Sequence, residues 1–453
     1  MHWKRLLNQR NTANVLRNRN LSTLSAIKDT DVVVVSYART PIARFGGSFR
    51  GLTAPQLGAL SIKGAIEKLP LFPCEKIGEA FMGNVVSAGI GQAPARQAVL
   101  GAGLSTNIPC TTVNKVCASG MKAVMMAALS ISSGYRESCI AGGMESMSNI
   151  PYYLPSAARH GGLRMGNSNL VDGLINDGLW DPYNDQHMGL CGETCAEHYD
   201  ITRGDQDQYA IRSYQRAADA WKSGKFSNEV VPVEIKKGGQ PTVTVLEDEE
   251  YVHVKPEKLV TLKAAFAKDG GTITAANSSK INDGAAAMVM VSGKLCRELN
   301  LNPLFRVRGF GDAAKDPVDF TTAPAAAIPC ALAHAGVALN DIDYHEINEA
   351  FAVVPLVNAR YRNFASPCVC CPYKILIPAS IILYYVYRLL SLDLDRINVF
   401  GGAVALGHPI GMSGARIIGT LYSVLKHNDA TLGCASICNG GGGASAIVIE
   451  RLQ

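Results

Sequence analysis

The sequence has few charged residues and few aromatic residues, although glycine is abundant. Only 18% of its 453 residues are charged and 7% are aromatic, whereas 44 residues are glycine. This composition excludes a coiled coil, a collagen-like chain, a disulfide-rich miniprotein and a disordered tail. The length is instead sufficient for two or three domains with buried cores.

Long apolar runs are also absent. The longest run with membrane character, ILIPASIILYYVY at 375–387, contains a proline and is shorter than the ~20 residues that span a bilayer. The N-terminus has no continuous apolar region of the kind found in secretory signals. We therefore expect no membrane partner.

The 13 cysteines are odd in number and irregularly spaced, which indicates free thiols in a reducing compartment.

Acidic residues are missing from the first segment, 1–28, which is rich in arginine and lysine. Without this segment the formal net charge falls from +5 to −1, so the rest of the chain has no basic excess for nucleic acid. The segment also carries Ser and Thr, and its apolar residues recur at helical spacing. We predict a mitochondrial transit peptide at 1–28 and a location in the matrix; an unstructured basic terminus is the alternative.

Short apolar runs alternate with helical patterns along the rest of the chain, which predicts an α/β fold. Strands are expected at 31–38, 110–116 and 139–146, and helices at 54–69, 119–134 and 205–224. The stretch 151–275 is richer in Tyr, Asn, Asp and His. We predict an N-terminal half, an inserted loop domain, a return to the first half and a C-terminal half, at 29–150, 151–275, 276–300 and 301–453 respectively.

Two segments of the two halves resemble each other. Residues 116–134 and 407–425 each place a reactive side chain shortly before a Gly-Met-small sequence that opens a helix. Such a repeat would suit two pseudo-symmetric halves that share one site, and coincidence in Gly- and Met-rich text is the alternative.

Four residues have chemistry suited to a reactive site. Cys117 lies where a strand passes into a helix, whose N-terminus would lower the thiol pKa and activate a nucleophile; a small buried hydrophobe is the alternative. His408 lies in a G-H-P-I-G turn, where an imidazole can accept a thiol proton. Asn348 begins an expected helix and offers an amide donor. Cys438 precedes a glycine run, which lets backbone N–H groups converge on a ligand oxygen.

Together the motifs VNKVCASGMKA, NEAF, GGAVALGHPIGMSGAR and CNGGGGASA, in this order, resemble the thiolase family over 31–452 except 361–388. The resemblance implies two pseudo-symmetric α/β halves in a layered αβαβα arrangement with an inserted loop domain. The CNGGGG run, His187–Met188 and AANSS are similar to the mitochondrial acetoacetyl-CoA thiolases. This similarity implies an acetyl-CoA C-acetyltransferase that reversibly condenses two acetyl-CoA to acetoacetyl-CoA plus CoA, with 2-methylacetoacetyl-CoA as a further substrate. It also implies a homotetramer without a covalent cofactor.

Three alternatives are considered. A 3-ketoacyl-CoA thiolase of β-oxidation would differ in acyl-chain length. An inactive CoA-binding protein with the thiolase fold would follow if 361–388 disrupts the site. A papain-like hydrolase would use Cys, His and Asn, but it does not account for Cys438 or the glycine run.

The resemblance also implies residue roles. Cys117 is the nucleophile that carries the acetyl group, and His408 takes its proton. His408 and a water held by Asn348 bind the enolate oxygen, and Cys438 is the acid/base of the second step. The N–H groups of Cys117 and Gly440 form the other oxyanion hole.

Further positions match coenzyme A contacts, the acyl pocket and a potassium site of the family. His253 and Lys255 differ from the residues expected there. The coenzyme A positions are Tyr214, His253, Val254, Lys255, Lys258 and Ser279; the acyl-pocket positions are His187 and Met188; the potassium positions are Tyr214, Ala275, Ala276, Ser278 and Val404.

The segment 361–388 interrupts the family pattern between Asn348 and His408. It contains three prolines, the cluster Cys368, Cys370 and Cys371, and the apolar run described above. We interpret it as a gene-modelling error or retained intron sequence that the working enzyme lacks. We expect it to bulge from an intact core; a genuine surface loop is the alternative.

Overall fold

The computed structural model describes residues 24–452, except 25, 237–240, 255 and 361–389. Most of the predicted transit peptide and all of the predicted insertion therefore lie outside the described residues. No helix in the described ranges is long and apolar enough to cross a membrane.

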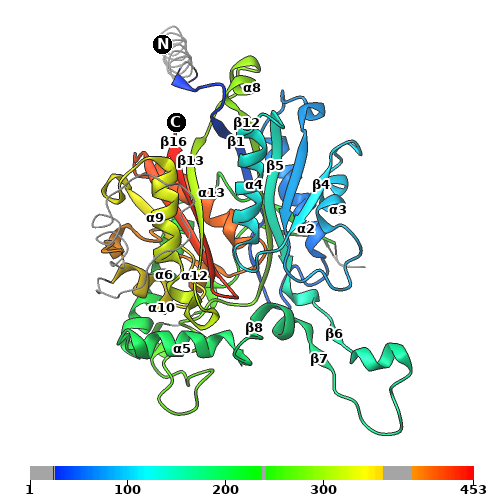
Figure 1. Ribbon diagram of the computed structural model, residues 1–453, viewed down its shortest axis with the longest axis vertical. Coiled ribbons are helices and arrows are strands. Elements are labelled where there is room, and N and C mark those ends of the chain that lie inside the picture. The colour runs from blue at the N-terminus through cyan, green and yellow to red at the C-terminus, as the bar shows by residue number, and fades with distance from the viewer. Residues whose placement is uncertain (1–23, 25, 237–240, 255, 361–389, 453) are drawn as a thin grey trace.

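One mixed sheet runs through the molecule in the order β14-β15-β16-β13-β1-β12-β5-β3-β4, with β2 paired to β12 (Figure 1). The strands of its N-terminal half are β1 (Val32–Arg39), β2 (Ala43–Arg44), β3 (Glu79–Gly83), β4 (Cys110–Val113), β5 (Ser138–Ser146) and β12 (Asn282–Ser292). Those of its C-terminal half are β13 (Phe305–Ala314), β14 (Tyr344–Ile347), β15 (Leu432–Asn439) and β16 (Gly443–Arg451). The halves join where β1 pairs with β13 over only three residue pairs.

Helices lie on both sides of each half of the sheet. Helices α2 (Ala54–Glu67) and α3 (Pro94–Gly101) cover the outer face of the N-terminal strands, and α9 (Pro324–Ala335) covers the outer face of the C-terminal strands. Helices α4 (Ser119–Ser132) and α13 (Ser413–His427) lie between the two halves (Figure 1). This order of layers is the predicted αβαβα arrangement. The strands and helices expected at the six ranges above are all present within a few residues.

The two central helices pack against each other through glycines. A Cβ placed on Gly120 of α4 would lie 2.9 Å from the backbone nitrogen of Ala415, and one on Gly414 of α13 would lie 2.5 Å from that of Met121. Side chains at either position would force the helices apart. The reciprocal contact supports the internal repeat over coincidence, and it brings the two helix N-termini together.

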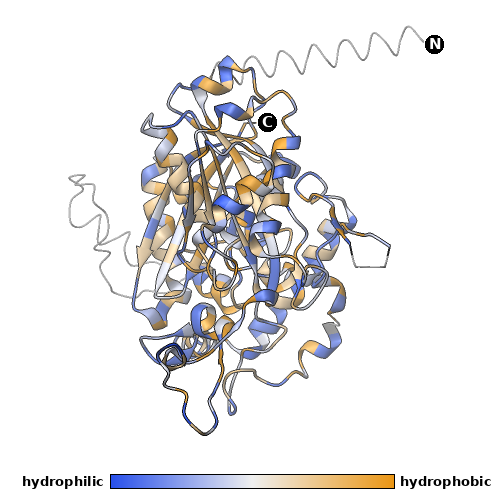
Figure 2. Cartoon of the chain, turned by 90° about the vertical axis from the view of Figure 1, so that its right-hand side faces the viewer, coloured by the Kyte–Doolittle hydropathy of each residue, from blue (hydrophilic) through white to orange (hydrophobic). Residues whose placement is uncertain are grey.

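The apolar core follows these layers. Buried side chains of α4 and α13 form one large cluster with inward-facing strand residues, while α2 with α3, and α9, bury their own clusters on the outer faces. Figure 2 shows this concentration of apolar residues on the central strands and the helices beside them. The catalytic candidates are therefore held by the most buried part of the molecule.

The stretch 151–275 forms the lower part of the molecule in Figure 1. An arm with short strands β6 (Tyr152–Tyr153) and β7 (Val171–Asp172) projects from it. Its other elements are β8 (Trp180–Asp181), β9 (Gln186–His187), α5 (Met188–His198), α6 (Arg203–Lys222), β10 (Val233–Ile235), β11 (Val243–Val245) and α7 (Pro256–Leu259). The chain then returns to the sheet, followed by α8 (Gly293–Glu298).

The segment around Asn348 differs from the expectation. Asn348 does not begin a helix but follows directly after β14, and α10 (Val353–Ala359) begins only five residues later. The buried NEAF stretch bends because its side chains and backbone bond to neighbouring segments, which overrides its helical pattern. Helix α10 ends at Ala359, and Arg360 has an extended backbone.

Candidate active site

Cys117 lies at the bend between β4 and α4. The preceding residue, Val116, has a positive φ of 46°, an uncommon conformation for a β-branched residue that turns the chain sharply into the helix. The Cys117 thiol is buried, and the backbone N–H groups of Gly440 and of Cys117 itself lie beside it. Two amide donors therefore meet at this sulfur.

Burial changes the expected protonation of this thiol. Loss of solvent raises the pKa of Cys117 to about 12, and the two backbone N–H groups only partly offset this effect. The expectation that the helix N-terminus lowers the pKa is therefore wrong for the free enzyme. The thiol is neutral at rest and needs a base when it reacts.

Cys438 is the second thiol of the site. It is fully buried near the end of β15, two residues before Gly440. Its pKa is raised well above the ordinary range by burial and, next in size, by charge on Cys117. The two thiols are thus close enough to influence each other's ionisation. Their predicted roles, nucleophile for Cys117 and acid/base for Cys438, require this proximity.

His408 has a defined tautomer. Its Nδ1 lies 2.6 Å from the Ser413 hydroxyl oxygen, and that hydroxyl donates its only hydrogen to the Pro409 carbonyl at 2.9 Å. His408 must therefore donate through Nδ1–H, which leaves the Nε2 lone pair free to accept a proton. Burial and then the charge of Arg416 lower its pKa to about 3, so the ring is a neutral base at rest.

Asn348 stands beside that base. Its side-chain nitrogen lies 3.4 Å from His408 Nε2, and its own N–H donates to the Ser436 carbonyl at 2.9 Å. The buried Asn348 Oδ1 has no hydrogen-bond partner among the described residues. The sequence segments before and after 361–388 thus meet at one point, where an oxygen of a ligand or a water would find polar groups.

Two buried carboxyl groups that the sequence analysis missed hold these loops. Glu349 accepts hydrogen bonds from Tyr209, Ser213 and Asn398 and from the N–H of Val404. It therefore fixes the NEAF loop against α6 and against the short helix α12 (Ala403–Leu406), just before His408. The signal in the sequence was an acidic residue directly after Asn348 in the NEAF motif.

Glu145 has the same function on the other side of the site. It accepts bonds from the Asn84 side chain and from the N–H groups of Val85, Val86 and Gly411. Burial raises its pKa to about 8. Because Gly411 belongs to the His408 turn, Glu145 connects that turn to the end of β5. Its position as the only acidic residue of an apolar strand was a signal in the sequence.

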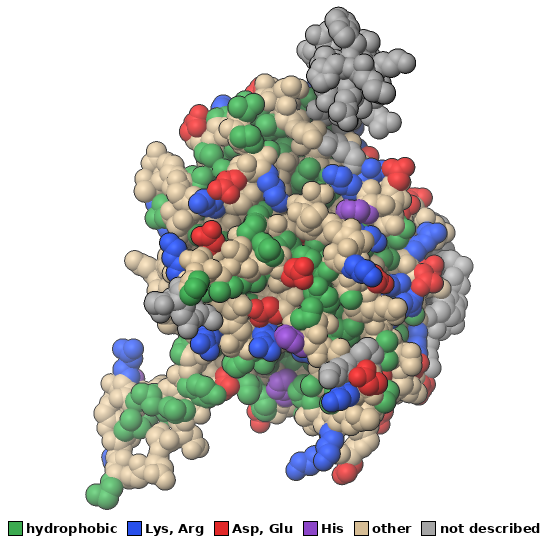
Figure 3. Space-filling view, turned by 180° about the vertical axis from the view of Figure 1, so that it is seen from behind, with side chains coloured by type: hydrophobic (Ala, Val, Ile, Leu, Met, Phe, Trp, Pro, Cys, Tyr) green, Lys and Arg blue, Asp and Glu red, His purple; other side chains and the backbone are tan. Residues whose placement is uncertain are grey.

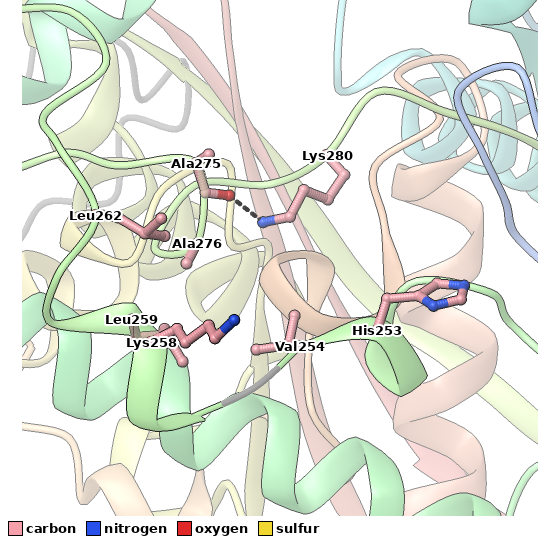
Figure 4. A pocket seen from close by; sticks show the side chains of 8 residues that line it. All are labelled: His253, Val254, Lys258, Leu259, Leu262, Ala275, Ala276 and Lys280. Carbon is pink, nitrogen blue, oxygen red and sulfur yellow. Dashed lines mark hydrogen bonds between the residues drawn. The ribbon is translucent and has the colours of Figure 1, made fainter.

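Three of the six predicted coenzyme A residues, His253, Val254 and Lys258, line one cavity of about 400 Å³ (Figure 4). Lys258 and Val254 point into it, whereas the His253 ring points away. Lys280, which the sequence analysis did not select, also lines it. The full lining is His253, Val254, Lys258, Leu259, Leu262, Ala275, Ala276 and Lys280.

The remaining predicted positions lie around this cavity or nearer the thiols. Tyr214 donates from its hydroxyl to the Ala276 carbonyl at 3.3 Å, and the Ser279 N–H donates to the Ala350 carbonyl at 3.0 Å. Lys255 lies outside the described residues.

His187 and Met188 lie at the thiol end. A Cβ on Gly440 would meet the Met188 side chain at 3.4 Å, so Met188 packs beside the glycine whose N–H reaches Cys117. The His187 ring stacks on Phe266 with centroids 4.6 Å apart, and its Nδ1 accepts the Gly189 N–H at 3.0 Å. Apolar and aromatic groups therefore confine the space next to the thiols.

A thiol facing two amide donors, a neutral imidazole base and a second thiol define an enzyme that transfers an acyl group through a cysteine. Two family models match the chain: "Thiolase, N-terminal domain" over residues 32–294 and "Thiolase, C-terminal domain" over residues 301–451. The chain belongs to the thiolase family.

Relatives with described functions agree with this assignment. The chain is 49% identical to the acetyl-CoA acetyltransferase of Schizosaccharomyces pombe, over 94% of this chain and 100% of that protein. It is also 49% identical to the mitochondrial acetyl-CoA acetyltransferase of Rattus norvegicus, over 93% of this chain and 91% of that protein.

Solved structures show the same fold. The Acat5 thiolase from Ascaris suum, in complex with coenzyme A, matches with a TM-score of 0.80 and 44% identity, over 93% of this chain and 100% of that one. The acetyl-CoA acetyltransferase of Bacillus anthracis matches with a TM-score of 0.82 and 34% identity, over 93% of this chain and 98% of that one.

Proposed function

We propose that this thiolase is an acetyl-CoA C-acetyltransferase that condenses two acetyl-CoA to acetoacetyl-CoA and CoA, and catalyses the reverse thiolysis. The observation that carries the proposal is that two buried pairs, Cys117 with Cys438 and His408 with Asn348, are connected through β15, where the Asn348 N–H bonds to Ser436, two residues before Cys438. The names of the relatives support the acetyl substrate, and the Ascaris suum complex supports coenzyme A as the carrier.

In the first half-reaction, the Cys117 sulfur attacks the thioester carbon of acetyl-CoA. His408 accepts the thiol proton at Nε2 as the new carbon–sulfur bond forms, and the proton then passes to the departing CoA sulfur. The N–H groups of Cys117 and Gly440 stabilise the tetrahedral oxyanion. The products are S-acetyl-Cys117 and free CoA.

In the second half-reaction, Cys438 first passes its thiol proton to Nε2 of His408, and the resulting thiolate then removes a proton from the methyl group of a second acetyl-CoA. The resulting enolate oxygen is held by His408 and by a water on Asn348, and the enolate carbon attacks the acetyl group on Cys117. The bond from the acetyl carbon to sulfur then breaks, the Cys117 sulfur takes the proton from Nε2 of His408, and acetoacetyl-CoA leaves. In thiolysis Cys438 returns the proton instead.

The coenzyme A moiety would lie in the 400 Å³ cavity between α7 and the loop at Ala275–Lys280. Tyr214, Lys258 and Ser279 are proposed contacts, with His253, Val254 and Lys255 beside the nucleotide. His187 and Met188 would confine the acyl chain to acetyl, acetoacetyl and 2-methylacetoacetyl groups.

Thiolysis rates for acetoacetyl-CoA and for a long-chain 3-ketoacyl-CoA test this assignment. We expect acetoacetyl-CoA to react and the long chain to be excluded, because the confined space near Met188 cannot accept it. Comparable rates for both substrates would favour the β-oxidation alternative, and no thiolysis at all would favour an inactive CoA-binding protein.

We propose the mitochondrial matrix as the location and residues 1–28 as a transit peptide. The basic composition of that segment supports this proposal, as do relatives named as mitochondrial in rat and cattle. Import of the full chain into isolated mitochondria with cleavage near residue 28 would support it, and retention outside them would contradict it.

We further propose three domains. The N-terminal half comprises 29–150 and 276–300, the loop domain at 151–275 is inserted into it, and the C-terminal half comprises 301–453.

We expect a homotetramer built as a dimer of dimers. The projecting arm exposes apolar side chains to solvent, visible in green at the lower left of Figure 3, and β4 is a sheet edge. Exposed apolar patches of this kind mark protein interfaces. The exposed apolar residues of the arm are Tyr152, Leu154, Leu163, Met165, Leu170 and Val171.

Light scattering on the protein without its first 28 residues should give about four times the chain mass, since both surfaces would be covered by other copies. Substituting Leu163 and Met165 with Ser should reduce this to a dimer. A monomeric wild-type protein at micromolar concentration would contradict the proposal.

We expect a variant without 361–388 to retain thiolysis activity. The N–H of Leu392 donates to the carbonyl of Ala359, the last residue of α10, at 3.3 Å. The flanks of the segment thus already meet. In the shortened chain these two residues would have the spacing of the 6→1 hydrogen bond that ends many helices.

Rates and thermal midpoints of the shortened and full-length proteins check this expectation. Equal or higher activity in the shortened chain would support our interpretation of 361–388. A shortened chain that folds with an unchanged thermal midpoint but has lost its activity would show that the segment is part of the working enzyme.

A further inference from the structure

Lys280 is a half-buried cation in the loop that lines the coenzyme A cavity. Its ammonium group donates a hydrogen bond to the carbonyl of Ala275 (Figure 4) and another to the carbonyl of Ser278 at 2.9 Å. It also lies 5.7 Å from the centre of the Tyr214 ring, on which a cation is attracted by the ring quadrupole. Burial lowers its pKa to about 8, opposed by the nearby charge of Glu250, so the amine remains protonated at neutral pH.

These partners are the ones that the family resemblance gives to a potassium ion. Ala275, Ser278 and Tyr214 all belong to the five potassium positions, and a fourth, Ala276, accepts the Tyr214 hydroxyl. Carbonyl oxygens attract a potassium ion and an ammonium group for the same electrostatic reason. The two cations cannot share these carbonyls, because like charges at hydrogen-bond distance repel strongly. The residues present therefore do not fit a bound potassium ion.

The loop that Lys280 holds also reaches the catalytic candidates. Ser279 donates its N–H to the Ala350 carbonyl, and the N–H of Ala352 donates to the Asn277 carbonyl at 2.8 Å. Ala350 lies two residues after Asn348. A charge that fixes the loop thus supports the coenzyme A cavity on one side and the enolate-binding amide on the other.

We propose that Lys280 supplies the cation of this loop from within the chain, so that the enzyme needs no potassium ion. The inference rests on the proposed function where the thiolysis rate is measured. The thermal midpoint tests it independently of that function. A monovalent metal cation in solution would find the site filled.

The wild-type protein gives the first test. Acetoacetyl-CoA thiolysis and the thermal midpoint should be the same in potassium, sodium and choline chloride at equal ionic strength. Higher activity or a higher midpoint in potassium than in the other two salts would overturn the proposal.

Lys280→Thr gives the second test, because threonine removes the charge and frees the carbonyls. In sodium or choline chloride we expect a loss of coenzyme A affinity and rate of roughly tenfold, within the usual range for coupling between two sites. Potassium should restore the rate and raise the thermal midpoint of this variant. The matched control, Lys63→Thr, alters an exposed lysine of α2 and should behave like wild type in every salt.

The outcomes separate the two proposals. If Lys280→Thr folds but neither its rate nor its midpoint depends on the salt, Lys280 does not replace an ion. If no protein shows thiolysis in any salt, the proposed function fails, while the thermal midpoints still decide the role of Lys280.

Discussion

Cys117→Ser should lower the rate of acetyl transfer by at least roughly a thousandfold, as is found when an enzyme loses its nucleophile. The serine hydroxyl is a far weaker acid than the thiol, and the buried site makes ionisation harder still. The expected cause is loss of the acyl-enzyme. Steady-state thiolysis of acetoacetyl-CoA, together with coenzyme A binding measured by calorimetry, checks this prediction.

Binding separates a chemical defect from a folding defect. Cys117→Ser should still bind coenzyme A, since the cavity near Lys258 and Lys280 does not involve the thiol. Cys296→Ser serves as the matched control, because it changes another buried cysteine, on α8. A Cys117→Ser protein with near wild-type turnover would remove this residue from the nucleophile role.

Cys438→Ala should leave the first half-reaction and stop the second. Acetyl-CoA should acetylate the variant and release one equivalent of CoA, after which turnover should fall by about 10²- to 10⁴-fold, the usual contribution of an acid/base group. The physical reason is that the variant lacks the thiol, paired with Cys117 in the wild type, that would take the methyl proton. Rapid-mixing measurement of CoA release followed by the steady-state rate gives both quantities.

Cys434→Ala is the control for this variant. Cys434 is a buried thiol on the same strand, β15, but it belongs to the outer cluster with Ala446 and Val448. It should keep both half-reactions. If Cys438→Ala turned over like Cys434→Ala, another group would have to be the acid/base.

The resting protonation states explain why two weakly ionised groups can still catalyse. The pKa of Cys117 is raised to about 12 and that of His408 is lowered to about 3, so at neutral pH the thiol keeps its proton and the imidazole is uncharged. An ion pair is unfavourable in the dry resting site. The proton should therefore move only as the sulfur–carbon bond forms, when the Cys117 and Gly440 amides begin to bear the oxyanion charge.

The layered fold could be predicted from the sequence because its local patterns and its tertiary contacts agree. The apolar run at β1 and the Gly-Met motif that opens α4 appear at nearly their expected positions. Asn348 was misplaced on a helix because NEAF has a helical pattern, whereas Glu349 anchors it through contacts distant in sequence. Local propensity does not contain such contacts.

The identity of the site residues could be predicted from the sequence more completely than their protonation states. The thiol pKa of Cys117 depends on burial by both halves, which a single helix N-terminus does not reveal. The tautomer of His408 depends on the Ser413 hydroxyl and the Pro409 carbonyl. The position of Lys280 directly after AANSS is evident in the sequence. Its contact with the Ala275 carbonyl depends on the folded loop and could not be predicted.

The location of the acetyl group after mixing with acetyl-CoA tests the central claim most directly. Peptide mass spectrometry on the Cys438→Ala protein, in which the intermediate should accumulate, can assign it to a residue. The account predicts one acetyl group, on the peptide that contains Cys117. An acetyl group found only on another cysteine, or none despite bound coenzyme A, would contradict it.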